Sequence, residues 1–256
     1  MKKLDARSWG FLVVAVIAAS IFLRLGTWQL DRLNDRRADN ARRQVVAALP
    51  PLPVSGSADL PPLDSVLWRR VHLTGEWDFG KEIIIRGRAA YSSPGVHVVT
   101  PLRLEDGKAF LVLRGWLPAA DGLSADVHAA RPFFSEGTDA ETVQITGLAL
   151  PGEPSSALPP RWKRVGGSRL LVLGSLDFDS AERALGETLV HAWVLPDSLP
   201  DLEASVTPRP VQQPTPSDGP HLLYAIQWFG FAAITIAGAF VFVRTRRQTD
   251  SERSSA

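Results

Sequence analysis

The chain has 256 residues, a formal net charge of +1 and 45% hydrophobic residues, which is enough for one ordinary domain with additional segments. Because the basic residues are nearly matched by acidic ones, no nucleic-acid partner is expected. Cysteine is absent and Met1 is the only methionine. This excludes disulfides, thiolate catalysis, iron–sulfur clusters, covalent haem attachment through cysteine, and copper sites built from cysteine or methionine.

The first predicted element is a transmembrane helix at residues 9–25, after a short tail at residues 1–8. The stretch is apolar apart from Arg24, whose long side chain can extend toward the lipid head groups. A helix predicted over residues 26–49 continues it with a rough apolar stripe, and Pro50 ends that helix.

A cleaved signal peptide is the competing interpretation of the same stretch. Lys2 and Lys3 would form its basic start, and Ala18–Ser20 would supply a cleavage site of small residues. The helical pattern continues without a break through Trp28 and Leu33, which favours a retained span. A span that begins so early leaves no room for a transit peptide, so we expect a bacterial plasma membrane.

Residues 50–206 are predicted to form one β-rich domain, either an antiparallel sheet or a barrel-like fold. Its runs of branched aliphatic and aromatic residues are typical of strands, and they lie at residues 82–87, 95–104, 109–118, 142–150, 169–174 and 188–195. Glu105–Gly107 is predicted to be a tight turn between two of them. One short helix is predicted where Asp177 or Asp179 can cap an amphipathic segment that ends at Gly186.

A proline-rich tether is predicted at residues 207–220, before a second transmembrane helix at residues 221–243. Residues 222–243 carry no charge and are long enough to cross a hydrocarbon layer of about 30 Å. Arginine is in excess in the tail at residues 244–256, which indicates a cytoplasmic C-terminus. With two spans, both termini are expected in the cytoplasm and the β-rich domain outside it.

No catalytic signature is present. The sequence has no GxSxG, HExxH or phosphate-binding loop, so we do not expect an enzyme. His72, His97 and His191 lie in strand-like runs and have no second ligand at metal-binding spacing. They are expected to be ordinary surface or core histidines.

His221 differs because it opens the second span and shares one helix face with two aromatic residues. At 100° per residue it lies in line with Tyr224 and Trp228 above small residues, while the opposite face is bulky and suited to lipid. In one interpretation, the aromatic residues belong to an interfacial belt and the small residues pack on the first span. In the other, the face binds a flat ligand that carries a metal, since a neutral imidazole is a natural axial ligand for haem iron.

Strand alternation in the run Ala109–Pro118 places Arg114 and Trp116 on the face opposite its leucines. If the leucine face belongs to the core, Arg114 and Trp116 are candidates for a partner surface, where arginine and tryptophan are frequent. In the alternative interpretation, Trp116 caps an edge of the sheet.

Three stretches in register resemble the Surfeit-locus family of cytochrome c oxidase assembly factors. They are LGTWQLDRL after the first span, GVHVVTPLRLEDGKAFLVLRGWLP in the domain, and HLLYAIQWFGFA at the start of the second span. The resemblance covers residues 25–243 and includes the layout with two spans.

The resemblance implies an accessory protein, not an enzyme, that binds or hands over haem a for insertion into oxidase subunit I. Other assembly factors and haem a synthase are further candidate partners. His221 is then the implied haem ligand, with Tyr224 and Trp228 beside it. The residues implied in partner contacts or structural motifs are Trp28, Gln29, Arg32, Arg114, Gly115, Trp116, Pro118 and Gln227. A structural scaffold of the oxidase that binds no haem is the alternative.

Overall fold

The computed structural model describes residues 6–121, 142–165, 168–197 and 208–252. The chain divides into two compact units. Residues 1–42 and 215–256 make up the helix unit, and residues 43–214 make up the barrel unit.

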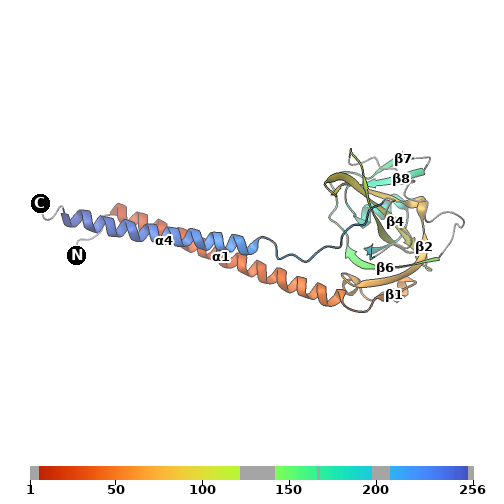
Figure 1. Ribbon diagram of the computed structural model, residues 1–256, viewed down its shortest axis with the longest axis horizontal. Coiled ribbons are helices and arrows are strands. Elements are labelled where there is room, and N and C mark those ends of the chain that lie inside the picture. Colours follow the sequence, from red (N-terminus) through yellow and green to blue (C-terminus); the bar gives the residue numbers. More distant parts are fainter. Residues whose placement is uncertain (1–5, 122–141, 166–167, 198–207, 253–256) are drawn as a thin grey trace. The chain divides into compact units, whose positions relative to one another are not determined.

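The helix unit is built on two helices, α1 (Ala6–Ala47) and α4 (His221–Glu252), which lie side by side in Figure 1. Both are long and apolar enough to cross a membrane by length and composition. The predicted juxtamembrane segment continues the first span in one unbroken helix, and α4 extends beyond residue 243 into the predicted tail. Together with the barrel described below, these helices confirm the predicted fold class.

The face that α4 turns toward α1 is the one with small residues. Ala225 and Ala232 are each only 1% exposed, whereas Leu223 and Ile234 on the other side are about 70% exposed. On α1, Gly26 leaves room for a ring of α4, because a Cβ atom there would lie 2.6 Å from the ring of Phe229. The prediction of a helix with two different faces is confirmed, and the small-residue face serves helix packing.

Nine strands form one sheet within the described part of the barrel unit. They are β1 (Leu52–Val54), β2 (Arg70–Trp77), β3 (Ile83–Ala90), β4 (Ser93–Arg103), β5 (Ala109–Pro118), β6 (Thr142–Pro151), β7 (Arg161–Val165), β8 (Ser168–Leu173) and β9 (Leu189–Pro196). The six strand runs predicted from the sequence are β3, β4, β5, β6, β8 and β9. The other three strands were not predicted.

Strands β2, β6, β9, β5 and β4 close into a ring, because β4 pairs with both β5 and β2. Strands β3, β8 and β7 continue the sheet outward from β4, and β1 extends it beyond β2. The strand pairs β1–β2, β3–β8 and β5–β9 are parallel. The sequence left open an antiparallel sheet or a barrel-like fold. The domain is a barrel, and its strands pair in both parallel and antiparallel orientation.

Strand β5 is buried on both faces. Phe110 and Val112 belong to a buried cluster with members from all five ring strands. Leu111 and Leu113 belong to a second cluster, in which β3, β8 and the helix α3 (Phe178–Leu185) also take part. With apolar contacts on both sides, every residue of β5 except Pro118 is buried.

Short local elements complete the barrel unit: α2 (Leu63–Val66), η1 (Ser57–Asp59) and η2 (Phe79–Lys81). The predicted turn at Glu105–Gly107 joins β4 to β5. Helix α3 begins after Asp177, whose carboxylate accepts a hydrogen bond from the N–H of Asp179, and it ends at Gly186 in a left-handed conformation. Both of these local predictions are confirmed.

Candidate functional site

His221 and Gln29 form the central polar contact of the helix unit. Nδ1 of His221 lies 2.9 Å from the side-chain oxygen of Gln29 on α1. With that amide oxygen as the acceptor, Nδ1 carries the proton and Nε2 has a free lone pair. In histidines that bind metals, a hydrogen bond from the other ring nitrogen commonly fixes the ring orientation and the tautomer.

The chain that leads into His221 is held on α1 about two to three turns beyond Gln29. The carbonyl oxygen of Ser217 accepts hydrogen bonds from Asn40 at 3.1 Å and Arg36 at 3.4 Å. The carboxylate of Asp218 pairs with Arg37 at 2.8 Å. These contacts fix the start of α4, and none of them was predicted from the sequence.

The two aromatic residues predicted beside His221 lie in different surroundings. Trp228 stacks on Phe22 of α1, with ring centroids 5.8 Å apart, and Phe231 meets both rings. Tyr224 is 47% exposed. Trp228 therefore takes part in helix packing, and of the two aromatic residues Tyr224 presents more free surface near His221.

The other predicted motif residues of the helix unit lie near the surface. Trp28 is 42% exposed, and the guanidinium of Arg32 lies 5.8 Å from its ring centroid. Arg32 also lies 3.6 Å from Asp35. Gln227 is exposed and makes no hydrogen bond within the described residues. The side-chain hydrogen bond between the two helices near this point is the one from His221 to Gln29.

The prediction that Arg114 and Trp116 offer a partner surface is wrong. The side chains of Arg114 and Glu82 are both 0% exposed, and they form an ion pair at 2.7 Å. Thr100 donates a further hydrogen bond to the same carboxylate oxygen. Strand alternation would leave one face of β5 exposed, but apolar clusters cover both of its faces.

A β-bulge also interrupts the alternation on which that prediction relied. Gly115 pairs with Val98 and Leu113 pairs with Val99, so Arg114 is an extra residue on β5. Gly115 has φ +147, which favours glycine. The bulge directs the arginine to the buried Glu82.

Trp116 is buried beneath the segment Pro208–Pro214, which we call the strap. The N–H and C=O groups of Trp116 and Arg209 form two hydrogen bonds, each 2.8 Å long. A Cβ atom at Gly115 would lie 2.6 Å from the carbonyl oxygen of Arg209, so glycine is needed there. The hydroxyl of Tyr91 donates to the carbonyl of Pro210 at 2.6 Å. The predicted tether is therefore partly bound to the barrel unit.

Pro118, another residue of the predicted motif, is the exposed last residue of β5.

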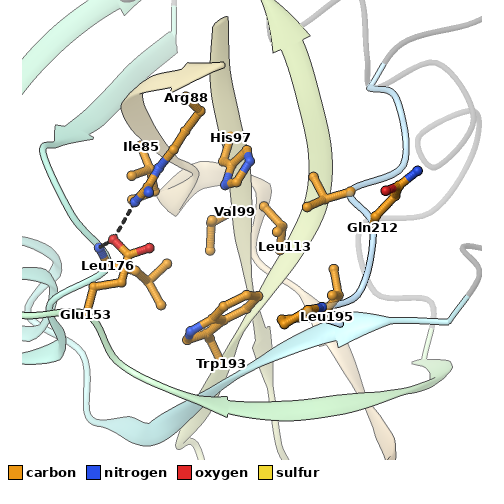
Figure 2. Close-up of a pocket in the computed structure, with 12 residues that line it drawn as sticks. Ile85, Arg88, His97, Val99, Leu113, Glu153, Leu176, Trp193, Leu195 and Gln212 are labelled. Carbon is orange, nitrogen blue, oxygen red and sulfur yellow. Dashed lines mark hydrogen bonds and ion pairs between the residues drawn. The ribbon is translucent and has the colours of Figure 1, made fainter. Parts of the chain in front are cut away.

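The barrel unit contains a cavity of about 80 Å³. Figure 2 shows His97 and Arg88 on one side and Trp193 below them, with Glu153 paired to Arg88. Val211 and Pro214 of the strap also line it. The cavity is too small for a porphyrin, since pockets for ligands of drug size measure about 300–1,000 Å³.

His191 has potential metal-binding neighbours that its sequence spacing does not reveal. Its ring and the carboxylates of Asp179 and Glu182 place their ligand atoms within 4.8 Å of one another. Glu182 already accepts a hydrogen bond from the N–H of Leu189 at 2.8 Å. The cluster lies near the surface, where such acidic groups commonly occur without a metal.

The fold and these sites define a membrane protein with two spans that carries a β-barrel domain. Residues 16–233 match the model of the SURF1 family. The chain belongs to this family of oxidase assembly factors, as the resemblance to the Surfeit-locus proteins predicted.

Relatives with the same description occur in distant organisms. A SURF1-like protein of Rickettsia bellii is 24% identical over 237 residues, which cover 91% of this chain and 90% of that protein. An uncharacterized SURF1-like protein of Mycobacterium bovis is 25% identical over 245 residues, with 93% and 84% coverage. A SURF1-like protein of Monosiga brevicollis is 29% identical over 265 residues, with 93% and 87% coverage.

Proposed function

We propose that this protein receives haem a as cargo at His221 and hands it over for insertion into subunit I of a haem–copper cytochrome c oxidase. The hydrogen bond between Gln29 and Nδ1 of His221 is the observation that supports this proposal. It holds the ring in one tautomer and leaves Nε2 with the lone pair that a haem iron requires. The proposal places the protein in a bacterial cell membrane, with both termini in the cytoplasm and the barrel unit outside.

The residues around His221 fit a cargo that is bound briefly. Haem iron bound through one imidazole would supply a directional bond, and an exposed aromatic residue such as Tyr224 would add contact with the macrocycle. Among the described residues, Trp228 is already stacked on Phe22 and contributes to a helix contact. A small set of contacts favours release to subunit I, in agreement with transfer.

A structural scaffold that holds an oxidase intermediate without haem is the second candidate. It is supported by the small-residue face of α4, which packs on α1 and leaves no open bed for a macrocycle on that side. In this case His221 would anchor the start of α4 through Gln29, and its Nε2 would have no ligand. The two candidates therefore predict different results for purified protein.

The test is to purify the full chain from a strain that makes haem a, then to record its absorption spectrum and extract its haem. Replacement His221→Ala is expected to abolish or strongly alter the haem spectrum with unchanged protein yield, because no apolar side chain replaces the iron–imidazole bond. Gln29→Leu is expected to retain haem with a shifted spectrum, since it removes the partner of Nδ1 and not the ligand.

Two matched controls separate the ligand role from general damage. His191→Ala removes a histidine of the barrel unit, and Thr235→Val changes a side chain deep in α4 that donates only to the carbonyl of Phe231. Both are expected to retain the normal spectrum. An unaltered haem spectrum in His221→Ala would show that His221 is not the ligand, and a haem-free wild-type protein would favour the scaffold.

A further inference from the structure

The cavity of the barrel unit combines an apolar wall with a polar end. Its apolar part is formed by strands β3, β4, β5 and β9 together with the strap, and the polar end is formed by Arg88, His97 and Glu153 (Figure 2). Small-molecule sites generally have this composition, with apolar walls and a few polar groups that fix orientation. The cavity is independent of His221, which belongs to the helix unit.

Two polar groups at this end lack hydrogen-bond partners. Nε of Arg88 is buried and has no acceptor among the residues that the structure describes. Within the same residues, no hydrogen bond is made by the ring of His97. Buried polar groups are nearly always satisfied, so the open Nε of Arg88 calls for an acceptor in the cavity, either an ordered water or a bound molecule.

The charges at the polar end cancel. A guanidinium nitrogen of Arg88 pairs with the carboxylate of Glu153, which also accepts from the N–H of Leu176. Burial, with the neighbouring Arg88 cation as a second cause, lowers the pKa of His97 to about 4. The imidazole is therefore neutral near pH 7, and the cavity favours an uncharged ligand, because a buried ion without a partner is costly.

The ligand must be small and must both accept and donate a hydrogen bond. A volume of about 80 Å³ holds roughly five to eight water-sized groups, which corresponds to one six-membered ring with a substituent. A hydroxyl oxygen can accept from Nε of Arg88 while its proton is donated to the unprotonated nitrogen of His97. The ring of Trp193 supplies an aromatic contact for such a molecule.

We propose that this cavity binds an uncharged phenol-type ring, whose hydroxyl group is held between Arg88 and His97 beneath the strap. The ring is either a free small molecule or the head of a longer lipid. The site is distinct from the proposed haem site, so either proposal can fail without the other.

The experiment uses the full chain in detergent, with its histidines labelled with ¹⁵N, and titrates it with phenol. The side-chain signals of His97, assigned by their loss in His97→Leu, are expected to shift and saturate with a Kd of about 0.1–1 mM, which is ordinary for a ligand of this size. Benzene, which lacks the hydroxyl, is expected to bind about tenfold more weakly because the polar end stays unsatisfied. Tighter binding of 4-hexylphenol than of phenol would identify a lipid head as the source, and equal binding would identify a free molecule.

Two variants test the assigned contacts by the heat of phenol binding. Arg88→Lys retains the cation but removes the Nε donor, and His97→Leu removes the acceptor; each is expected to weaken phenol binding about tenfold. His72→Leu, on a strand that does not line the cavity, is the matched control and is expected to bind phenol normally. Absence of saturable shifts at His97 up to 20 mM phenol, or equal binding of phenol and benzene, would overturn the proposal and leave a cavity filled by water.

Discussion

The start of α4 and the bulge of β5 each contain residues that the sequence singled out, but these residues differ in how accessible they are. At the start of α4, His221 uses one ring nitrogen for Gln29 and leaves the other available. At the bulge, Arg114 is enclosed with Glu82 and has no exposed side-chain surface. Of these residues, His221 keeps a ring nitrogen that a ligand could use, whereas Arg114 has a structural role, and burial distinguishes the two.

The difference follows from the packing of the two elements. The helix α4 contacts α1 on one face only, so the residues at its start remain accessible. Strand β5 lies between β4 and β9 with apolar clusters on both faces. A charge at such a position is tolerated only with an opposite charge and hydrogen bonds around it, which Glu82 and Thr100 supply.

The largest expected effect comes from breaking the buried ion pair. Arg114→Met leaves the carboxylate of Glu82 without its cation, which costs about 3–5 kcal/mol of unfolding free energy for pairs of this kind. The loss is measured by denaturant unfolding of the purified protein. Oxidase maturation is then expected to fall in proportion to protein abundance, because the effect is on folding.

The matched control is the double variant Glu82→Leu with Arg114→Met. Replacement of a buried pair by apolar residues is often neutral or stabilising, so most of the lost stability should return. If Arg114→Met leaves stability and abundance unchanged but stops maturation, Arg114 has a functional role after all.

A smaller effect is expected from acid titration of His97. Its folded-state pKa is lowered from 6.5 to about 4, so the unfolded chain binds the proton more readily than the folded one. The corresponding stability is fully present above pH 6.5 and is lost as the pH falls toward 4, by at most about 3 kcal/mol. Unfolding curves at several pH values measure this loss, and His97→Leu is expected to flatten the profile over this interval. An unchanged profile in that variant would assign the pH dependence to other groups.

The sequence predicted local elements more successfully than contacts between distant residues. The Asp177 cap, the Gly186 end of α3 and the turn after β4 follow from neighbouring residues, so local patterns were sufficient. Strand β2 was missed although Val71, Leu73 and Gly75 alternate with more polar residues, a period-two signal that could have revealed it. Closure of the ring by β2 and β4 depends on pairing between remote segments, which no local pattern contains.

The candidate site shows the same limit. His221 was singled out because it shares a helix face with Tyr224 and Trp228, but its hydrogen-bond partner Gln29 lies 192 positions away in the sequence. Glu82 and Arg114 are likewise separated by 32 positions and a bulge that shifts the register. Helical and strand periods predict which face a residue occupies, and not which residue of another element it meets.

The smallest expected effect concerns the strap, where the barrel unit holds part of the predicted tether. Tyr91 and Ser92 both have positive φ values in the turn between β3 and β4, which is costly for residues other than glycine, and this turn presents the Tyr91 hydroxyl to Pro210. Tyr91→Phe removes that one hydrogen bond, worth about 0.5–1.5 kcal/mol, and retains the ring against Trp116. Amide hydrogen exchange at Arg209 is therefore expected to become about two- to tenfold faster, with global stability changed by less.

Tyr224→Phe, which alters the only other tyrosine, is the matched control and should leave the Arg209 amide unchanged. Equal exchange in Tyr91→Phe and the wild type would mean that the two backbone bonds to Trp116 hold the strap without the tyrosine.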